Sequence, residues 1–84
     1  MSEPGDIQQK LANELERSLT ERYGEILNTA ALARELGYPS TAAFRMAVLR
    51  GRIDLQVFEI PNRKGRFALA RDVAVWIAQL RHQK

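Results

Sequence analysis

Residues 27–53 read LNTAALARELGYPSTAAFRMAVLRGRI and contain two short helical patterns with a turn between them. Asn28 or Thr29 offers an N-cap oxygen for the first helix. Its expected inward side chains are Leu32, Ala33 and Leu36. Gly37 and Pro39 end this helix, because glycine suits the left-handed C-terminal position and proline has no N–H to donate to a continuing helix.

A second helix is predicted from Thr41 to Gly51, with Ser40 as its N-cap residue. The side chains on its core side recur at i, i+3 and i+4, and they are Phe44, Ala47 and Val48. Two short helices separated by a tight turn that contains glycine are the signature of a helix-turn-helix motif. The segment therefore predicts that motif.

After Ile53 the apolar residues change from a helical period to a period of two. Residues 56–60 and 66–69 are predicted to form the strands of a β-hairpin, with residues 62–65 as its loop. The expected pairs are Ile60 with Phe67 and Phe58 with Leu69, with Glu59 and Ala68 on the opposite face. The shared register of the two strands favours the hairpin.

Two longer amphipathic helices are predicted near the ends of the chain. Asp6 can cap the first, which extends to Tyr23 and Gly24. Its apolar stripe consists of Ile7, Leu11, Leu15 and Leu19. The second covers residues 71–81 and should close the core with Val73, Trp76, Ile77 and Leu80.

The predicted fold class is mainly α with a small β-hairpin, a winged helix-turn-helix of order α-α-α-β-β-α with an extra N-terminal amphipathic helix. Residues 25–84 are expected to form the winged helix-turn-helix domain. The helix within residues 1–24 is expected either to dock on the closing helix or to pair two chains. A chain of 84 residues is long enough for one such domain.

Composition and charge narrow the class of protein. Apolar residues make up 45% of the chain and charged residues 27%, which is typical of globular proteins. Residues 1–39 carry four basic and seven acidic side chains, whereas residues 40–71 carry seven basic and two acidic ones. A basic segment of this kind favours a polyanionic partner, because lysine and arginine release the counterions condensed on nucleic acid.

Several other classes are not favoured. The chain has no cysteine and one histidine, His82, without clustered partners, so neither a metal site nor a cofactor is expected. No catalytic residues are predicted, because no nucleophile has a base beside it and the glycines form no phosphate-binding loop. No apolar run approaches the ~20 residues that cross a bilayer. Residues 1–6 lack the features of a signal peptide, so we expect a cytoplasmic protein.

The order of motifs between Leu27 and Leu80 resembles a known family. The matching segments are LNT at 27–29, AALARELG at 30–37, Ser40 and Thr41, LRGRI at 49–53 and DVAVWI at 72–77. They resemble the excisionase-like, MerR-type winged-helix family, which includes phage excisionases and AlpA-like regulators, and are also similar to small pyocin-activator regulators. The resemblance implies a nucleoid-associated transcriptional regulator or an excisionase-type recombination factor that binds double-stranded DNA at specific sites. Asp54 stands where the family often has proline.

The residues expected to meet DNA fall into two groups. On a helix with Phe44 inward, the outward face consists of Ala42, Met46 and Leu49, flanked by Arg45 and Arg50. This face suits a major groove, where apolar side chains meet thymine methyl groups and arginine bonds guanine O6 and N7, so Arg45 is the best base-reading candidate. The candidate phosphate or minor-groove contacts are Ser40, Thr41 and Arg52, with Arg63, Lys64 and Arg66 in the wing.

Two alternatives stay open at this point. Ser40 can act as a helix cap only. The exposed pair Met46 and Leu49, bordered by arginine, is also typical of a protein interface, so the chain can instead be a non-enzymatic adaptor that uses this face or the N-terminal helix. A DNA-binding protein of this size usually gains specificity by pairing, which predicts a homodimer or a cooperative array.

Overall fold

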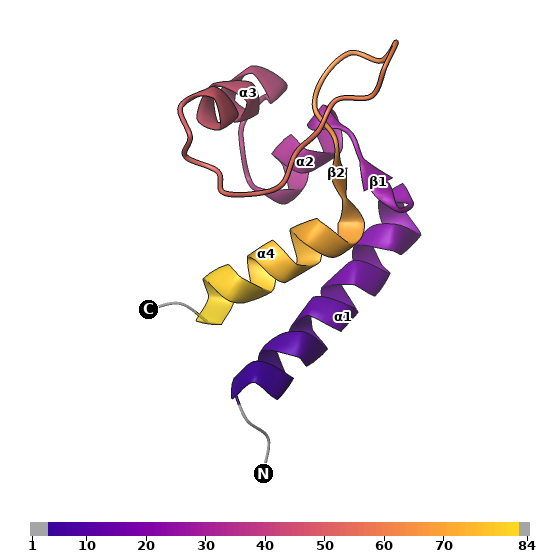
Figure 1. Ribbon diagram of the computed structural model, residues 1–84, viewed down its shortest axis with the longest axis vertical. Coiled ribbons are helices and arrows are strands. Elements are labelled where there is room, and N and C mark those ends of the chain that lie inside the picture. The colour runs from indigo at the N-terminus through magenta and orange to yellow at the C-terminus, as the bar shows by residue number, and fades with distance from the viewer. Residues whose placement is uncertain (1–3, 83–84) are drawn as a thin grey trace.

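The computed structural model describes residues 4–82 of the chain, and the side chains of residues 6–81. Their elements follow in the order α1 (Pro4–Tyr23), β1 (Ile26–Leu27), α2 (Thr29–Glu35), α3 (Thr41–Leu49), β2 (Ala68–Leu69) and α4 (Ala70–His82) (Figure 1). The prediction of a mainly helical chain with a small antiparallel β element is confirmed. Residues 1–3, which belong to the segment considered for a signal peptide, lie outside the described residues. So does the side chain of His82, which was considered as a metal ligand.

Helix α1 packs along α4, and these two helices occupy one end of the molecule, away from α3 (Figure 1). The predicted cap at Asp6 is wrong, because α1 begins at Pro4 and Asp6 lies in its first turn. Proline is favoured at a helix start, where no N–H is needed. Leu19 is buried and belongs to the main core, whereas Ile7, at the far end of the predicted stripe, is 49% exposed.

Helix α4 turns a face of small residues toward the interior. Its buried side chains are Ala70, Val73, Ala74 and Ala78. Trp76 and Ile77 are half-buried and pack against the core, as predicted. The predicted stripe fails at Leu80, which is 47% exposed, because the alanines shift the buried face around the helix.

The two short helices have the caps and the turn that the sequence predicts. The Asn28 side chain accepts a hydrogen bond from the N–H of Ala31 at 2.9 Å, and Ser40 Oγ accepts one from the N–H of Ala43 at 3.1 Å. Gly37 follows α2 with a φ of 81°, and the N–H of the next residue, Tyr38, donates to the carbonyl of Ala33 at 2.8 Å. This is the hydrogen bond of a Schellman helix end, which glycine favours.

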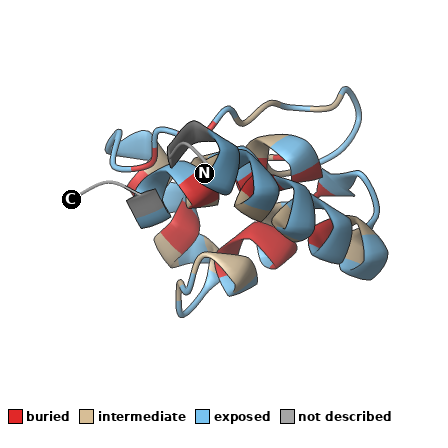
Figure 2. Cartoon of the chain, turned by 90° about the horizontal axis from the view of Figure 1, so that it is seen from below, coloured by how far each residue is buried: buried red, intermediate tan, exposed pale blue. Residues whose placement is uncertain are grey.

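The core between these helices consists of large apolar side chains. Leu27, Leu32, Phe44 and Val73 are fully buried, and Figure 2 shows the buried residues concentrated where the helices face one another. No polar or charged residue is buried among the described side chains. The described part of the chain also contains no helix of the length and apolar character that crossing a membrane requires.

The β structure departs from the prediction. Strand β2 pairs with β1, with Ile26 opposite Leu69 and Leu27 opposite Ala68. Phe58 forms an isolated antiparallel bridge with Phe67 rather than pairing with Leu69, so the predicted hairpin register is wrong. Ala68 is completely buried because it lies in the sheet with β1, whereas the prediction placed it on the outer face. The predicted strand 56–60 is otherwise irregular, and the core holds this segment through buried Ile53 and Leu55.

Candidate functional site

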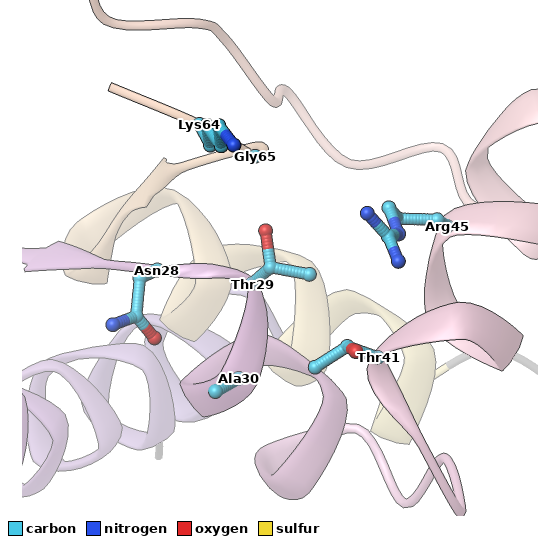
Figure 3. Close-up of a pocket in the computed structure, with 7 residues that line it drawn as sticks. All are labelled: Asn28, Thr29, Ala30, Thr41, Arg45, Lys64 and Gly65. Carbon is cyan, nitrogen blue, oxygen red and sulfur yellow. The ribbon is translucent and has the colours of Figure 1, made fainter. Parts of the chain in front are cut away.

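An open groove of about 290 Å³ lies between the start of α2, helix α3 and the loop that precedes β2. Its lining residues are Asn28, Thr29, Ala30, Thr41, Arg45, Lys64 and Gly65. We call it the α3–loop groove, and we call residues 59–66 the basic loop. In Figure 3 the Arg45 side chain points from α3 into the space below the basic loop, on the same side as Thr29. Three predicted site residues, Thr41, Arg45 and Lys64, thus line one groove although they come from two separate segments.

A pair of hydrogen bonds fixes the basic loop beside α2. The Thr29 hydroxyl accepts a bond from the N–H of Arg66 at 2.8 Å and donates one to the carbonyl of Arg66 at 3.0 Å. Gly65 lies directly over this hydroxyl, with a φ of 95°, and a Cβ at this position would come within 2.7 Å of Thr29 Oγ1. Only glycine therefore fits both the backbone conformation and the contact.

This attachment is one that sequence reasoning missed. Asn28 and Thr29 were equivalent candidates for the cap of α2, and the structure assigns the cap to Asn28, which leaves the hydroxyl of Thr29 for the loop. The signal in the sequence was the presence of two capping residues where one is enough. The groove residues Asn28, Thr29, Ala30 and Gly65 were not among the predicted site residues.

The tip of the basic loop is a tight turn. The N–H of Arg63 donates to the carbonyl of Ile60 at 3.0 Å, and the two residues between them are Pro61 and Asn62, the latter with a φ of 68°. Proline followed by a residue of positive φ is the pattern of a type II turn. The turn directs the chain back toward Phe67, so the loop is short and closed by the Phe58–Phe67 bridge.

The three cations of the basic loop differ in their surroundings. Arg63 is exposed, and its guanidinium carbon lies 5.7 Å from the centroid of the Phe67 ring. Arg66 is half-buried, with Nε 3.9 Å from a carboxylate oxygen of Glu59. Lys64 is exposed at the groove. Of the three, Lys64 thus lies best for a ligand that enters between the loop and α3.

The outward face of α3 is apolar at its centre and basic at its margins. Met46 is 43% exposed, Leu49 is 69% exposed, and Ala42 on the same face is also exposed. Arg45 flanks this face toward the groove, and Arg50 flanks it on the other side. The prediction for the outward face is therefore confirmed in its burial pattern.

The remaining predicted site residues lie outside the groove lining. Ser40 is exposed and caps α3, so the cap role is confirmed, while its hydroxyl hydrogen stays available to a ligand. Arg50 is the C-cap residue of α3, and Arg52 is exposed just beyond it. These residues surround α3 without lining the same hollow as Arg45 and Lys64.

The basic residues around α3 differ in whether they have a carboxylate partner. Arg45, Arg50, Arg52 and Lys64 form no ion pair with a carboxylate among the described residues. No acidic residue occurs between Glu35 and Asp54, so α3 carries none. The positive charge around the α3–loop groove is therefore not neutralised from within the protein. Nor do the described residues bring three or more histidine and carboxylate side chains together as metal ligands.

One cluster of paired charges lies where α1 meets α2. Arg22 on α1 donates to Glu35 of α2 at 2.8 Å, and the Tyr23 hydroxyl donates to the same carboxylate oxygen at 2.5 Å. The hydrogen bond to Glu35 raises the pKa of Tyr23 above its ordinary value of 10.0, with burial and the charge of Glu35 adding to the effect. This cluster joins α1 to α2.

No protein-family model, curated protein or solved structure matches this chain. Its function is therefore inferred from its own residues and their arrangement.

Proposed function

We propose that this protein binds double-stranded DNA at specific sites as a winged helix-turn-helix protein. In this proposal α2 and α3 form the helix-turn-helix, α3 is the recognition helix that enters the major groove, and the basic loop is the wing. The observation that carries the proposal is the α3–loop groove, where Arg45 from α3 and Lys64 from the basic loop line one surface.

The surroundings of these cations support a polyanion as ligand. Six basic residues lie between residues 45 and 66, and all of them except Arg66 form no ion pair among the described residues. Exposed cations of this kind release counterions when they approach DNA phosphates, which provides affinity without sequence preference. Arg63, with its side chain over Phe67, extends the basic surface along the wing.

The shape of the groove supports a division between residues that contact phosphates and residues that contact bases. A duplex with α3 in its major groove presents the bordering strand of phosphates to whatever lies beside the helix. Arg45 and Lys64 both line the groove at this position, so we assign both to a backbone phosphate, with Thr41 in the same lining. The sequence alone favoured Arg45 as a base reader, and the geometry favours the phosphate.

The biological outcome follows from where the DNA site lies. A transcriptional regulator and an excisionase-type recombination factor share the same binding step and need no catalytic residue, cofactor or metal. One recognition helix and one wing contact few base pairs, so we propose that two or more copies bind side by side as a homodimer or a cooperative array. Such a protein would act on the nucleoid in the cytoplasm.

A protein-protein adaptor is the second candidate function. The exposed side chains of Met46 and Leu49 favour it, because methionine and arginine are enriched at protein interfaces. In that case α3 would bind a partner protein, and DNA would not be the ligand. The absence of acidic residues from α3 favours DNA over such a partner.

Selection from a random duplex library, followed by sequencing of the recovered DNA, tests the proposal. We expect enrichment of a defined motif and binding in the nanomolar to micromolar range at low salt. The double variant Arg45→Ala, Lys64→Ala should lose most of this affinity and stay folded, because both side chains are exposed. Arg17→Ala, which removes an exposed arginine from α1, is the matched control and should bind like the wild type.

Failure to enrich any duplex, together with unchanged weak binding in the double variant, would replace the DNA-binding proposal with the adaptor. Enrichment without a motif would show that the protein binds DNA but does not recognise a site.

A further inference from the structure

We propose that the outward face of α3 recognises thymine methyl groups in the major groove. This inference rests on the proposed DNA-binding function and names the base feature that the site reads. The exposed face of α3 has an apolar centre. The residues at the centre of its exposed face are Ala42, Met46 and Leu49, and none of them is a strong hydrogen-bond donor or acceptor.

The arginines near α3 do not occupy this central position. Arg45 lines the groove toward the basic loop, so it is directed to the side of the face. Arg50 is the C-cap residue, and Arg52 lies beyond the helix. With Phe44 buried, the helical positions place the apolar residues between Arg45 on one flank and Arg50 on the other. The side chains left to meet the base edges are therefore apolar.

Base edges in the major groove offer one apolar group. Guanine, cytosine and adenine present hydrogen-bonding atoms there, whereas thymine adds a C5 methyl group to its acceptor oxygen. Met46 and Leu49 present an exposed apolar surface that gains from covering such a methyl, because both surfaces leave water. A guanine or cytosine edge against the same residues would lose water without gaining a hydrogen bond.

The charges around the face select DNA as its occupant. The apolar residues are bordered by Arg45, Arg50 and Arg52, without an acidic residue on α3. A second copy would present the same basic border, so two α3 faces would repel each other on approach. DNA offers the complementary arrangement, with methyl groups inside the groove and phosphates along both rims.

Replacement of thymine by uracil tests the proposal directly, because uracil lacks only the C5 methyl group and keeps the hydrogen-bonding atoms. The probe is the duplex recovered by selection, prepared once with dT and once with dU at the motif positions. We expect the dU duplex to bind about fourfold more weakly for each contacted methyl, as expected for a buried apolar group of ~0.8 kcal/mol. The ratio between the duplexes should stay constant as salt is raised, because a methyl group carries no charge.

The double variant Met46→Ala, Leu49→Ala should lose this discrimination, so that the dT and dU duplexes bind nearly alike. Val75→Ala on α4 is the matched control, because Val75 is 40% exposed and lies on another element. That variant should keep the wild-type ratio. A cytosine in the motif should also bind more tightly as 5-methylcytosine in the wild type, since the added methyl occupies the same edge of the groove.

Three results would overturn the inference. Equal wild-type affinity for the dT and dU duplexes would leave DNA binding intact and remove the methyl contact. Unchanged discrimination in the double variant would place the methyl contact elsewhere. Loss of self-association in the double variant, measured by sedimentation, with wild-type DNA affinity would make the face an interface between copies. If the wild type binds no duplex at all, the proposed function fails before this inference is reached.

Discussion

Arg22 and Arg45 are both exposed arginines on helices, but their surroundings are opposite. Arg22 on α1 is bonded to Ser18 and Glu35, so its charge is compensated within the protein. Arg45 on α3 lines an open groove and has no carboxylate partner among the described residues. The charge of Arg22 is thus compensated where α1 meets α2, whereas we propose that the charge of Arg45 is compensated by a ligand.

One leucine of α1 and one leucine of α3 show a similar contrast in burial. Leu19 is 1% exposed where α1 meets the core, and Leu49 is 69% exposed on α3. Alanine shows the same contrast, since Ala74 is buried in α4 and Ala42 is exposed on α3. Leu19 and Ala74 therefore contribute to the core, whereas Leu49 and Ala42 lie on the face of α3 that we propose for recognition. Variants at matched positions test this separation.

Removal of residues 1–23 should have the largest effect, namely loss of the fold. Leu19 is part of the main core, Leu15 and Tyr23 pack against it, and α1 covers the alanine face of α4. Exposure of these surfaces is expected to exceed the marginal stability of a chain of this length. Circular dichroism and urea denaturation check the result. A truncated chain that unfolds cooperatively would show that α1 is an accessory and that residues 25–84 form an independent domain.

The substitutions Leu19→Ala and Leu49→Ala should separate stability from binding. Leu19→Ala should lower the free energy of unfolding by about 2 to 5 kcal/mol, because it leaves a cavity in the core. Leu49→Ala should change it by less than about 0.5 kcal/mol, because the side chain is mostly in water. In DNA-binding assays with folded protein, Leu49→Ala should have the larger effect and Leu19→Ala the smaller. Equal destabilisation by both substitutions would contradict the assignment of α3 as a recognition surface.

Substitution of Gly65 should affect both stability and DNA binding. Gly65→Ala is expected to cost about 1 to 2 kcal/mol of stability and to weaken DNA binding, because its Cβ would push the basic loop away from Thr29. Gly24→Ala is the matched control, since Gly24 also has a positive φ of 85° but no atom within 4 Å of an added Cβ. The control should lose stability only. Calorimetry and titration of a labelled duplex distinguish the two variants, and equal DNA affinity would show that the loop position is unimportant.

The smallest expected effect concerns Tyr23 and pH. The hydrogen bond to Glu35 raises the pKa of Tyr23 above 10.0, so the folded state holds the phenol proton more tightly than the unfolded state. The stabilisation is therefore complete below pH 10 and is lost as pH rises through the raised pKa. Tyr23→Phe should reduce the melting temperature at neutral pH and make its alkaline decline shallower.

Tyr38→Phe is the matched control for this pH dependence. Tyr38 packs edge-on against Phe44 with ring centroids 5.8 Å apart, and its hydroxyl forms no hydrogen bond among the described residues. An alkaline decline that is the same in both variants and in the wild type would show that Tyr23 does not contribute.

The sequence predicts the helix caps and turns of this chain better than it predicts which strands pair. The caps at Asn28 and Ser40 and the turn at Gly37 depend on neighbouring residues, so their patterns can be recognised in the sequence. The partner of a strand could not be recognised in this way. A period of two shows which side chains share a face, but it does not show which strand lies beside them. Residues 66–69 were thus predicted to pair with the preceding segment, whereas β2 pairs with β1, far away in the sequence.

The candidate site shows the same limit. The outward face of α3 follows from helical geometry once Phe44 is placed inward, and its exposure agrees with that prediction. The position of Arg45 and Lys64 in one groove and the bonds between Thr29 and Arg66 depend on how distant segments fold together. Helix stripes were also overestimated at Ile7 and Leu80, and at Leu80 the reason is that buried alanines shift the inward face of α4.

The most direct test of the account is the salt dependence of DNA affinity in single-charge variants. Each contact between a cation and a phosphate contributes about 0.9 to the slope of log K against log salt concentration. Arg45→Ala and Lys64→Ala should each reduce that slope by about one, on a selected and on a scrambled duplex alike, whereas Arg17→Ala should leave it unchanged. Equal slopes for all three variants would contradict the central claim that the α3–loop groove is where this protein holds DNA.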